Sequence, residues 1–225
     1  MFEQAPPMPN NTSLENNHEL INEIAQTNSK RWQDSLGQDA EAVAQLYGPE
    51  ATFLPTVSPD FKKGPGEAAG YFSHFLEKNP SCQIIEEQVK SLEDNSYLHY
   101  GKYNFAVGPT EARQTIEAEF SFVWQQNPAG QWEIIHHHSS MKPSEETAKN
   151  LQNILEQNLQ GDTIEEEIQN LGPDKYLQSG LQNFVIGPED NKQIIQTRFS
   201  FIWERNKDGQ WEITYNHSSL TPSKE

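Results

Sequence analysis

The chain has 225 residues, and its 33 acidic and 16 basic side chains give a formal net charge of −17. This charge argues against binding to nucleic acid or to an anionic membrane, because both need a basic surface. Cys82 is the one cysteine, which excludes an intrachain disulfide and a cysteine-based metal site. The sequence has no apolar run of roughly 18 to 20 residues that could span a membrane, and its start lacks the pattern of a secretory signal. We therefore expect a cytoplasmic protein.

The first part of the chain predicts a leader followed by two helices. Residues 1–14 are rich in Pro, Asn and Ser and are expected to be a disordered leader. From residue 15 to about 36, the apolar residues fall mostly on one helical stripe. Asp39 can cap a second helix that runs through Tyr47, and Gly48-Pro49 is expected to end it.

A short strand, a third helix and a run of strands come next. The short strand is expected over 51–56, and the aromatic third helix over about 67–78. Four further strands, separated by turn-forming residues, are predicted over about 83–92, 97–107, 114–125 and 131–140. Together these elements predict an α+β fold, in which a curved antiparallel sheet forms a cone around three helices.

The chain also contains an internal repeat. Residues 85–143 align without a gap on residues 164–222, with 27 identities in 59 positions. The chain is thus one complete domain, 15–143, a connecting amphipathic helix, 144–161, and a truncated second repeat of four strands, 162–225. A lone sheet cannot bury both of its faces. We expect the second sheet to pack on the first, with the connecting helix bridging them.

The first copy ends in His136-His137-His138-Ser139-Ser140. Side chains alternate between the two faces of a strand, so His137 and Ser139 point one way and the other three point the opposite way. Three consecutive strand residues cannot converge on one tetrahedral zinc ion. His136 and His138 could supply two ligands, but no well-placed third ligand is found, so we expect no metal. His138 and Ser140 recur in the second copy as His217 and Ser219, which also suits a structural role.

Several phrases carry a family resemblance over about residues 30–143. They are FLPTVS, YFSHFL, GKYNF, FSFVW and HHHSSMKP. With the elements in this order, the first domain resembles the nuclear-transport-factor-2-like fold. More narrowly it is similar to the association domain of calcium/calmodulin-dependent kinase II, and most narrowly to the iota-class carbonic anhydrases. That class implies reversible hydration of carbon dioxide to bicarbonate, a lyase activity, without a metal or another cofactor.

The resemblance also implies a site inside the cone. It gives Thr56, Tyr71, His137 and Ser139 catalytic roles, and we name Tyr103, His138 and Ser140 as substrate-binding residues. Hydroxyl groups both donate and accept hydrogen bonds, so they can surround bicarbonate and the attacking water. An imidazole with an ordinary pKa of about 6.5 can exchange the proton. Apolar walls are expected from Phe53, Phe72, Phe105 and Phe122.

The second copy departs from this pattern. Asn216 stands in place of His137 and Gln182 in place of Tyr103, so the second copy is expected to be non-catalytic. The family tends to have Arg before the first aromatic of the third long strand, where the first copy has Glu119 and the second has Arg198.

Two other functions remain open at this point. The first is a non-catalytic oligomerisation or ligand-binding module, in which the second copy serves as an interface within a homo-oligomer or an intrachain pseudo-dimer. The second is an isomerase or cyclase of the same fold. Such an enzyme usually needs a carboxylate in the pocket, and the one candidate, Glu119, points away from it by alternation.

Overall fold

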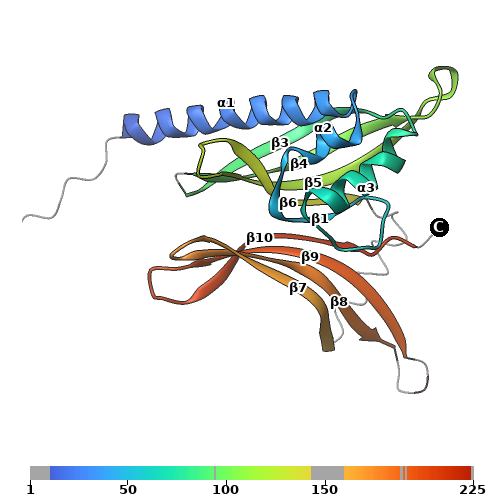
Figure 1. Ribbon diagram of the computed structural model, residues 1–225. Coiled ribbons are helices and arrows are strands. Elements are labelled where there is room, and N and C mark those ends of the chain that lie inside the picture. The colour runs from blue at the N-terminus through green and yellow to red at the C-terminus, as the bar shows by residue number, and fades with distance from the viewer. Residues whose placement is uncertain (1–10, 94, 143–159, 188–189, 191, 224–225) are drawn as a thin grey trace, which may run out of the picture.

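The computed structural model describes residues 11–93, 95–142, 160–187, 190 and 192–223, and it forms two stacked layers (Figure 1). The upper layer in that view is a six-stranded sheet covered by helices, and the lower layer is a four-stranded sheet. The helices are α1 (Asn11–Ser35), α2 (Ala40–Ala44) and α3 (Gly64–Leu76), with a short 3-10 turn at Thr110–Ala112. This is the α+β cone followed by a partial second repeat that the sequence predicts.

The strand order follows the repeat. The first sheet runs β2-β1-β6-β5-β4-β3, with β1 parallel to β6 and the other neighbours antiparallel. Its strands are β1 (Tyr47–Leu54), β2 (Lys62–Lys63), β3 (Ser81–Glu93), β4 (Ser96–Val107), β5 (Gln114–Gln126) and β6 (Trp132–Met141). The second sheet, β10-β9-β8-β7, is antiparallel throughout. Its strands are β7 (Gln160–Gly172), β8 (Lys175–Ile186), β9 (Gln193–Arg205) and β10 (Trp211–Leu220).

Some element boundaries differ from the expectation. Helix α1 begins at Asn11, so the last four residues of the predicted leader are helical. Asp39 caps α2 as predicted, because its carboxylate accepts a hydrogen bond from the backbone N–H of Ala42 at 2.8 Å. That helix ends at Ala44, however, and Gly48-Pro49 lies inside β1. Most of the predicted connecting helix lies outside the described residues, and its last two positions, 160 and 161, belong to β7.

The two copies share backbone detail as well as sequence. Each has three bulges at equivalent positions of the ladder, where one residue is left without a partner. The bulged residues are Ile85, Leu92 and Ile135 in the first sheet, and Ile164, Leu171 and Thr214 in the second. The bulge at Ile135 precedes the histidines, so regular alternation from His136 to Ser140 is retained.

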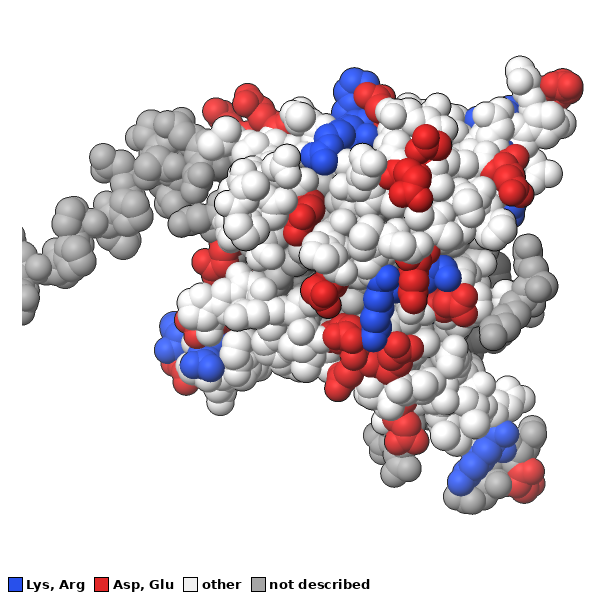
Figure 2. Space-filling model, viewed as in Figure 1, with Lys and Arg blue, Asp and Glu red and all other residues white. Residues whose placement is uncertain are grey.

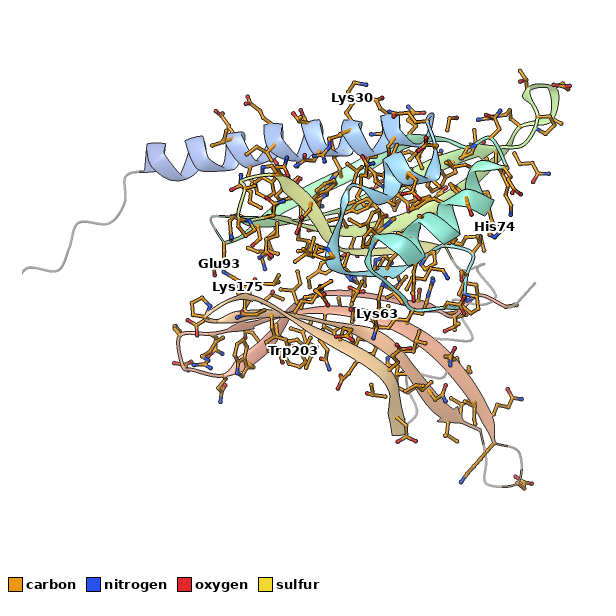
Figure 3. The ribbon with its side chains drawn as sticks, viewed as in Figure 1. Lys30, Lys63, His74, Glu93, Lys175 and Trp203 are labelled. Atoms are coloured by element: carbon orange, nitrogen blue, oxygen red, sulfur yellow. The ribbon has the colours of Figure 1, made fainter. Side chains whose placement is uncertain are left out.

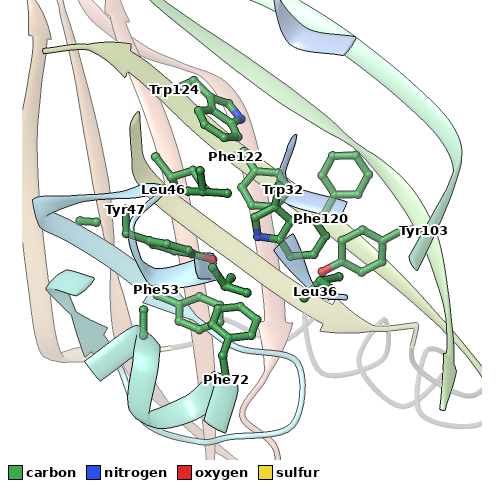
Figure 4. Close-up of a cluster of buried hydrophobic side chains, with 14 of the residues drawn as sticks. Trp32, Leu36, Leu46, Tyr47, Phe53, Phe72, Tyr103, Phe120, Phe122 and Trp124 are labelled. Atoms are coloured by element: carbon green, nitrogen blue, oxygen red, sulfur yellow. The ribbon is translucent and has the colours of Figure 1, made fainter. Parts of the chain in front are cut away.

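Aromatic side chains from the helices and from the strands fill the space between the helices and the first sheet (Figure 4). Trp32 of α1 is 2% exposed and lies near the centre of this core. Its ring is stacked 6.1 Å from that of Tyr103 and meets the ring of Phe122 edge-on at 5.2 Å. Buried aromatic side chains contribute the largest share of hydrophobic stabilisation, about 25 cal/mol per Å² of apolar surface. The core therefore fixes the inner face of β4, β5 and β6, which carries the candidate site.

The opposite face of the first sheet packs on the second sheet through equivalent residues of the two copies. The apolar part consists of Leu92, Leu98 and Val123 with their counterparts Leu171, Leu177 and Ile202. The stacked rings of His138 and its counterpart His217 lie 3.8 Å apart. A contact between a residue and its own counterpart is expected where two copies are related by a two-fold axis. The two copies therefore pair as the subunits of a symmetric dimer do.

Hydrogen bonds at this interface are reciprocal too. His138 Nε2 is 2.9 Å from Ser219 Oγ, and His217 Nε2 is 2.9 Å from Ser140 Oγ. The other ring nitrogens, the Nδ1 atoms, lie 2.8 Å from Ser200 Oγ and 3.0 Å from Ser121 Oγ respectively. Because a hydroxyl can donate or accept, each imidazole can remain neutral with both nitrogens satisfied.

Ion pairs flank the buried part of the interface (Figure 3). Lys63 binds Glu167 at 2.6 Å on one side, and Lys175 binds Glu93 at 3.1 Å on the other. These side chains are 22–42% exposed, and ion pairs of this kind contribute little to stability, about 0–1 kcal/mol each. On the face seen in Figure 2, acidic side chains outnumber basic ones, in keeping with the net charge. No helix in the described part of the chain is long and apolar enough to cross a membrane.

Candidate functional site

Three hydroxyl groups meet at Ser139, on the inner face of β6. The Oγ of Ser139 is within hydrogen-bonding distance of Thr56 Oγ1 and accepts a hydrogen bond from the hydroxyl of Tyr103. Thr56 follows the end of β1, which pairs with β6 in parallel, and Tyr103 comes from β4. All three side chains are buried. Burial raises the pKa of Tyr103, so its hydroxyl stays protonated at neutral pH.

His137 lies one pleat before Ser139 on the same face. Its Nδ1 is 2.8 Å from the hydroxyl of Tyr47, and its ring is stacked 4.0 Å from that of Phe122. Its Nε2 is buried and has no hydrogen-bond partner among the described residues. Burial, together with the nearby His136 and His217, holds the pKa of His137 well below its usual 6.5. The imidazole is therefore neutral at pH 7, and in the tautomer with its proton on Nδ1 it can accept a proton at Nε2.

A cavity of about 10 Å³ lies among these groups, roughly the room that one water molecule needs. Its lining combines the four polar residues Thr56, Tyr103, His137 and Ser139 with a wall of aromatic residues. That wall consists of Trp32, Phe53, Tyr71, Phe72, Phe75 and Phe105. The predicted walls Phe53, Phe72 and Phe105 are thus present, whereas Phe122 is not in the lining and instead stacks on His137.

Tyr71 lies between this cavity and the surface. It lies on α3, and it lines both the cavity and a groove of about 740 Å³ that reaches the surface beside α3. Phe75, one helical turn later, lines both spaces as well, and the two rings are stacked 5.8 Å apart. Burial raises the pKa of Tyr71, while the positive charge of Arg198 lowers it in part. Tyr71 and Phe75 therefore form the partition between groove and cavity.

His138 and Ser140 do not reach the cavity, so the expectation that they bind substrate with Tyr103 is not met by their placement. They lie on the outer face of β6 and bond to Ser200, Ser219 and His217 of the second repeat. The alternation of the strand is the reason, because it sends them opposite to Ser139. Their placement instead matches the structural role that their recurrence in both copies suits.

The two candidate metal ligands also face hydroxyl groups. His136 Nδ1 is 2.7 Å from Thr52 Oγ1 and its Nε2 is 2.8 Å from Ser200 Oγ. Both nitrogens of His138 are engaged with Ser200 and Ser219. Within the ranges that the structure describes, no three His, Cys, Asp or Glu side chains are grouped as metal ligands.

Sequence reasoning missed two residues that shape the site. Tyr47 was expected at the end of a helix, but it begins β1 and binds His137. Arg198 differs from its counterpart Glu119 in the first copy, and the structure places its guanidinium against the backbone of Ser139 and Pro55. The exchange of Glu119 for Arg198 was the signal in the sequence, although nothing local indicated what Arg198 contacts.

Comparisons with known proteins agree on the fold. The sequence profile of the calcium/calmodulin dependent protein kinase II association domain matches residues 21–143, which is more than half of the chain. A solved structure from Xanthomonas campestris, described as such an association domain, is 32% identical, with a TM-score of 0.51, covering 54% of this chain and 87% of that one.

A second structure shows the fold alone. It is an NTF2-like protein with a cystatin-like fold from Novosphingobium aromaticivorans, 15% identical, with a TM-score of 0.50, covering 64% of this chain and 99% of that one. A search of curated proteins found no match. With the cone, the strand order and the profile match together, the chain belongs to the calcium/calmodulin-dependent protein kinase II association domain family, within the NTF2-like fold.

Proposed function

We propose that the first repeat is a metal-independent carbonic anhydrase of the iota class, acting in the cytoplasm. The observation that carries the proposal is the meeting of the Thr56, Tyr103 and Ser139 hydroxyls at one cavity wall, beside the unpartnered Nε2 of His137. Hydroxyl groups and an acceptor nitrogen around a space for one water molecule suit a reaction that turns water and carbon dioxide into bicarbonate.

The chemistry follows from the protonation states. In the tautomer whose Nδ1–H donates to Tyr47, Nε2 of His137, a cavity-lining residue, is free to accept a proton from the water as the water oxygen bonds to carbon. One C=O electron pair moves onto oxygen, and bicarbonate forms while the proton passes from His137 to solvent. The hydroxyls of Ser139 and Thr56 stabilise the charge that develops on oxygen. The low pKa of His137 makes it a weak base, which takes the proton only as the C–O bond forms and releases it promptly afterwards.

Entry of the gas requires a movement at the partition. The cavity has room for about one water molecule, which is less than carbon dioxide and water need together. Tyr71 and Phe75 separate it from the groove beside α3. We assign Tyr71 the role of a displaceable wall between the groove and the cavity. A neutral gas is not repelled by the acidic surface, whereas bicarbonate arrives more slowly.

The test is carbon dioxide hydration by the full chain after treatment with a chelator. Replacing Ser139 or Thr56 by Ala should lower kcat/KM about 10²-fold, because each removes one positioned donor. Ser140→Ala is the matched control, since it removes a neighbouring hydroxyl on the other face of β6 and should keep the rate of the parent. Parent rates in both Ser139→Ala and Thr56→Ala would contradict the proposed site.

The alternative is a non-catalytic association module, which the name of the family suggests. The observation in its favour is the exposure of large apolar side chains on the second sheet, among them Ile194 at 69%, Ile168 at 60% and Ile213 at 44%. Sedimentation of the full chain over a range of concentrations separates the two functions. A homo-oligomer that Ile194→Glu dissociates, together with no hydration activity, would favour the association role.

A further inference from the structure

Arg198 belongs to the second repeat, but its guanidinium lies at the site of the first. It is on β9 and is 1% exposed, unlike the lysines that pair across the edges of the interface. Its counterpart in the first copy is Glu119, which is exposed. The pairing of the two copies is therefore asymmetric at this position, and the buried charge is directed toward the copy that carries the candidate site.

The contacts of Arg198 surround two cavity residues. Nη1 donates hydrogen bonds to the carbonyl oxygens of Pro55 and Ser58, the latter at 3.5 Å, and these residues flank Thr56 in the chain. Nη2 donates to the carbonyl of Ser139 at 3.1 Å. One planar group thus ties the loop that carries Thr56 to the strand that carries Ser139. The two hydroxyls that meet in the cavity are held together from behind.

Arg198 also brings a charge. No carboxylate lies within ion-pair distance of it among the described residues, and the fork is satisfied by carbonyls and by Ser219 Oγ at 3.1 Å. Burial lowers the pKa of Arg198 to about 10, so it remains protonated at neutral pH. Burying a cation without a counter-charge is costly. The positive field reaches the cavity, since it acts on the hydroxyls of Tyr71 and Tyr103.

We infer that Arg198 is a positioning residue, through which the second repeat aligns Thr56 with Ser139 and favours a small trigonal anion in the cavity once the partition of Tyr71 and Phe75 has opened. The inference rests on the proposed function, for which bicarbonate is the anion. It means that the truncated repeat completes the site rather than only covering a sheet. The cavity of the first repeat would then be incomplete in any version of the chain without β9.

The experiment uses the full chain in four forms: the parent, Arg198→Met, Arg198→Lys and the control Lys90→Met. Lys90 also crosses the interface, binding Glu204 at 2.7 Å, but it is remote from the cavity lining. Two readouts need no catalysis: the NMR signal of the Thr56 methyl group, and its titration with nitrate, an unreactive trigonal anion. The third readout is kcat and KM for carbon dioxide hydration.

We expect Arg198→Met to shift the Thr56 methyl signal, weaken nitrate binding at least tenfold and lower kcat at least tenfold. Arg198→Lys keeps the positive charge but loses the planar guanidinium that bonds both segments. Nitrate binding should therefore fall less than threefold, while the methyl signal still shifts and kcat still falls. Lys90→Met should match the parent in all three. Unchanged methyl signals and nitrate affinity in Arg198→Met would overturn the inference. If Arg198→Met fails to fold, a parent-like methyl signal and kcat in Arg198→Lys would overturn it.

The two proposals can fail separately. If nitrate shifts the Thr56 methyl signal of the parent chain but the parent does not hydrate carbon dioxide, the carbonic anhydrase proposal is contradicted. The positioning role of Arg198 is then still tested by the methyl signals and the nitrate affinities of the variants. A parent chain in which nitrate leaves the Thr56 signal unmoved would overturn the anion preference itself.

Discussion

Neighbouring residues of one strand take on opposite roles here because of the face on which each lies. Ser139 and His137 point into the cone, where Ser139 meets two other hydroxyls and His137 keeps one nitrogen free. His136 and His138 lie on the face toward the second sheet, and each of their ring nitrogens is engaged with a hydroxyl of Thr52, Ser200 or Ser219. A free nitrogen in a cavity can take part in chemistry, whereas a fully engaged imidazole holds structure. Identical side chains therefore differ in surroundings by two-residue periodicity alone, and under the proposed function they differ in role as well.

Tyr47 is the hydrogen-bond partner of His137 Nδ1, and its removal has a measurable cost. Tyr47→Phe would leave Nδ1 of His137 buried without a partner, so we expect the free energy of unfolding to fall by about 1–3 kcal/mol. Urea denaturation measures this change. Tyr100→Phe is the matched control, because it also deletes a hydroxyl, one that binds Gln88 at 2.6 Å near the surface. Equal losses in the two variants would show that the His137 contact has no special weight.

At the scale of elements, the repeated glycine of the two β-hairpins shows how closely the copies correspond. A Cβ at Gly101 would lie 1.9 Å from the carbonyl oxygen of Glu86, and a Cβ at its counterpart Gly180 would lie 2.0 Å from that of Glu165. Both glycines lie next to a bulge that brings the two strands together. In both copies, this close approach of the two strands is thus possible only when the residue at this position has no side chain.

Replacing Gly101 by Ala should therefore destabilise the chain by about 1–3 kcal/mol or more, because backbone must move to admit the methyl group. Thermal unfolding followed by circular dichroism measures the loss. Gly70→Ala offers the contrast, since a Cβ there meets nothing within 4 Å and alanine favours the helix. That variant should be as stable as the parent or more so, and a melting point lowered as far as that of Gly101→Ala would contradict the steric argument.

The sequence predicted the elements and the inner face of β6, but not the residues that depend on contacts between distant segments. Alternation is local, so the placement of His137 and Ser139 on one face follows from position alone. The start of β1 at Tyr47 does not, because parallel pairing with β6 outweighs the turn signal of Gly48-Pro49. The contact of Arg198 with Ser139 joins residues 59 positions apart and depends on the stacking of two sheets.

For the whole molecule, the interface between the two sheets combines leucines with buried histidines that are neutral. Burial lowers the pKa of His136 and of His217 to about 3, against 6.5 in an unfolded chain. Between these values the unfolded chain binds more protons than the folded one, so stability falls as the pH falls. The effect is absent above about pH 6.5 and grows as the pH decreases toward 3.

We therefore expect the midpoint of urea unfolding to be nearly constant from pH 8 to 7 and to decrease steadily from pH 6.5 to 4. A His136→Asn variant should show a shallower decrease, since one of the buried imidazoles is absent. Equal slopes for variant and parent over this range would place the acid sensitivity elsewhere, for instance in Glu87 and Glu204, whose pKa values are lowered in the fold.

Removing the second repeat should expose the buried interface. A chain ending at Lys142 would leave Leu92, Leu98 and Val123 of the first sheet in water. We expect this chain to aggregate or to form a new dimer through that face, which size-exclusion chromatography with light scattering would detect. A soluble monomer as stable as the parent would show that the second sheet is not needed to cover the first.

The two-fold pairing within one chain has a consequence for dilution. Two separate subunits joined by this interface would come apart at low concentration, because their association obeys mass action. Here the partner sheet belongs to the same chain, so its effective concentration does not depend on the concentration of the protein. The contacts of His138 with Ser219 and of Arg198 with Ser139 then form at any protein concentration. A site assembled from two copies can thus be complete in a single molecule, even when that molecule is scarce.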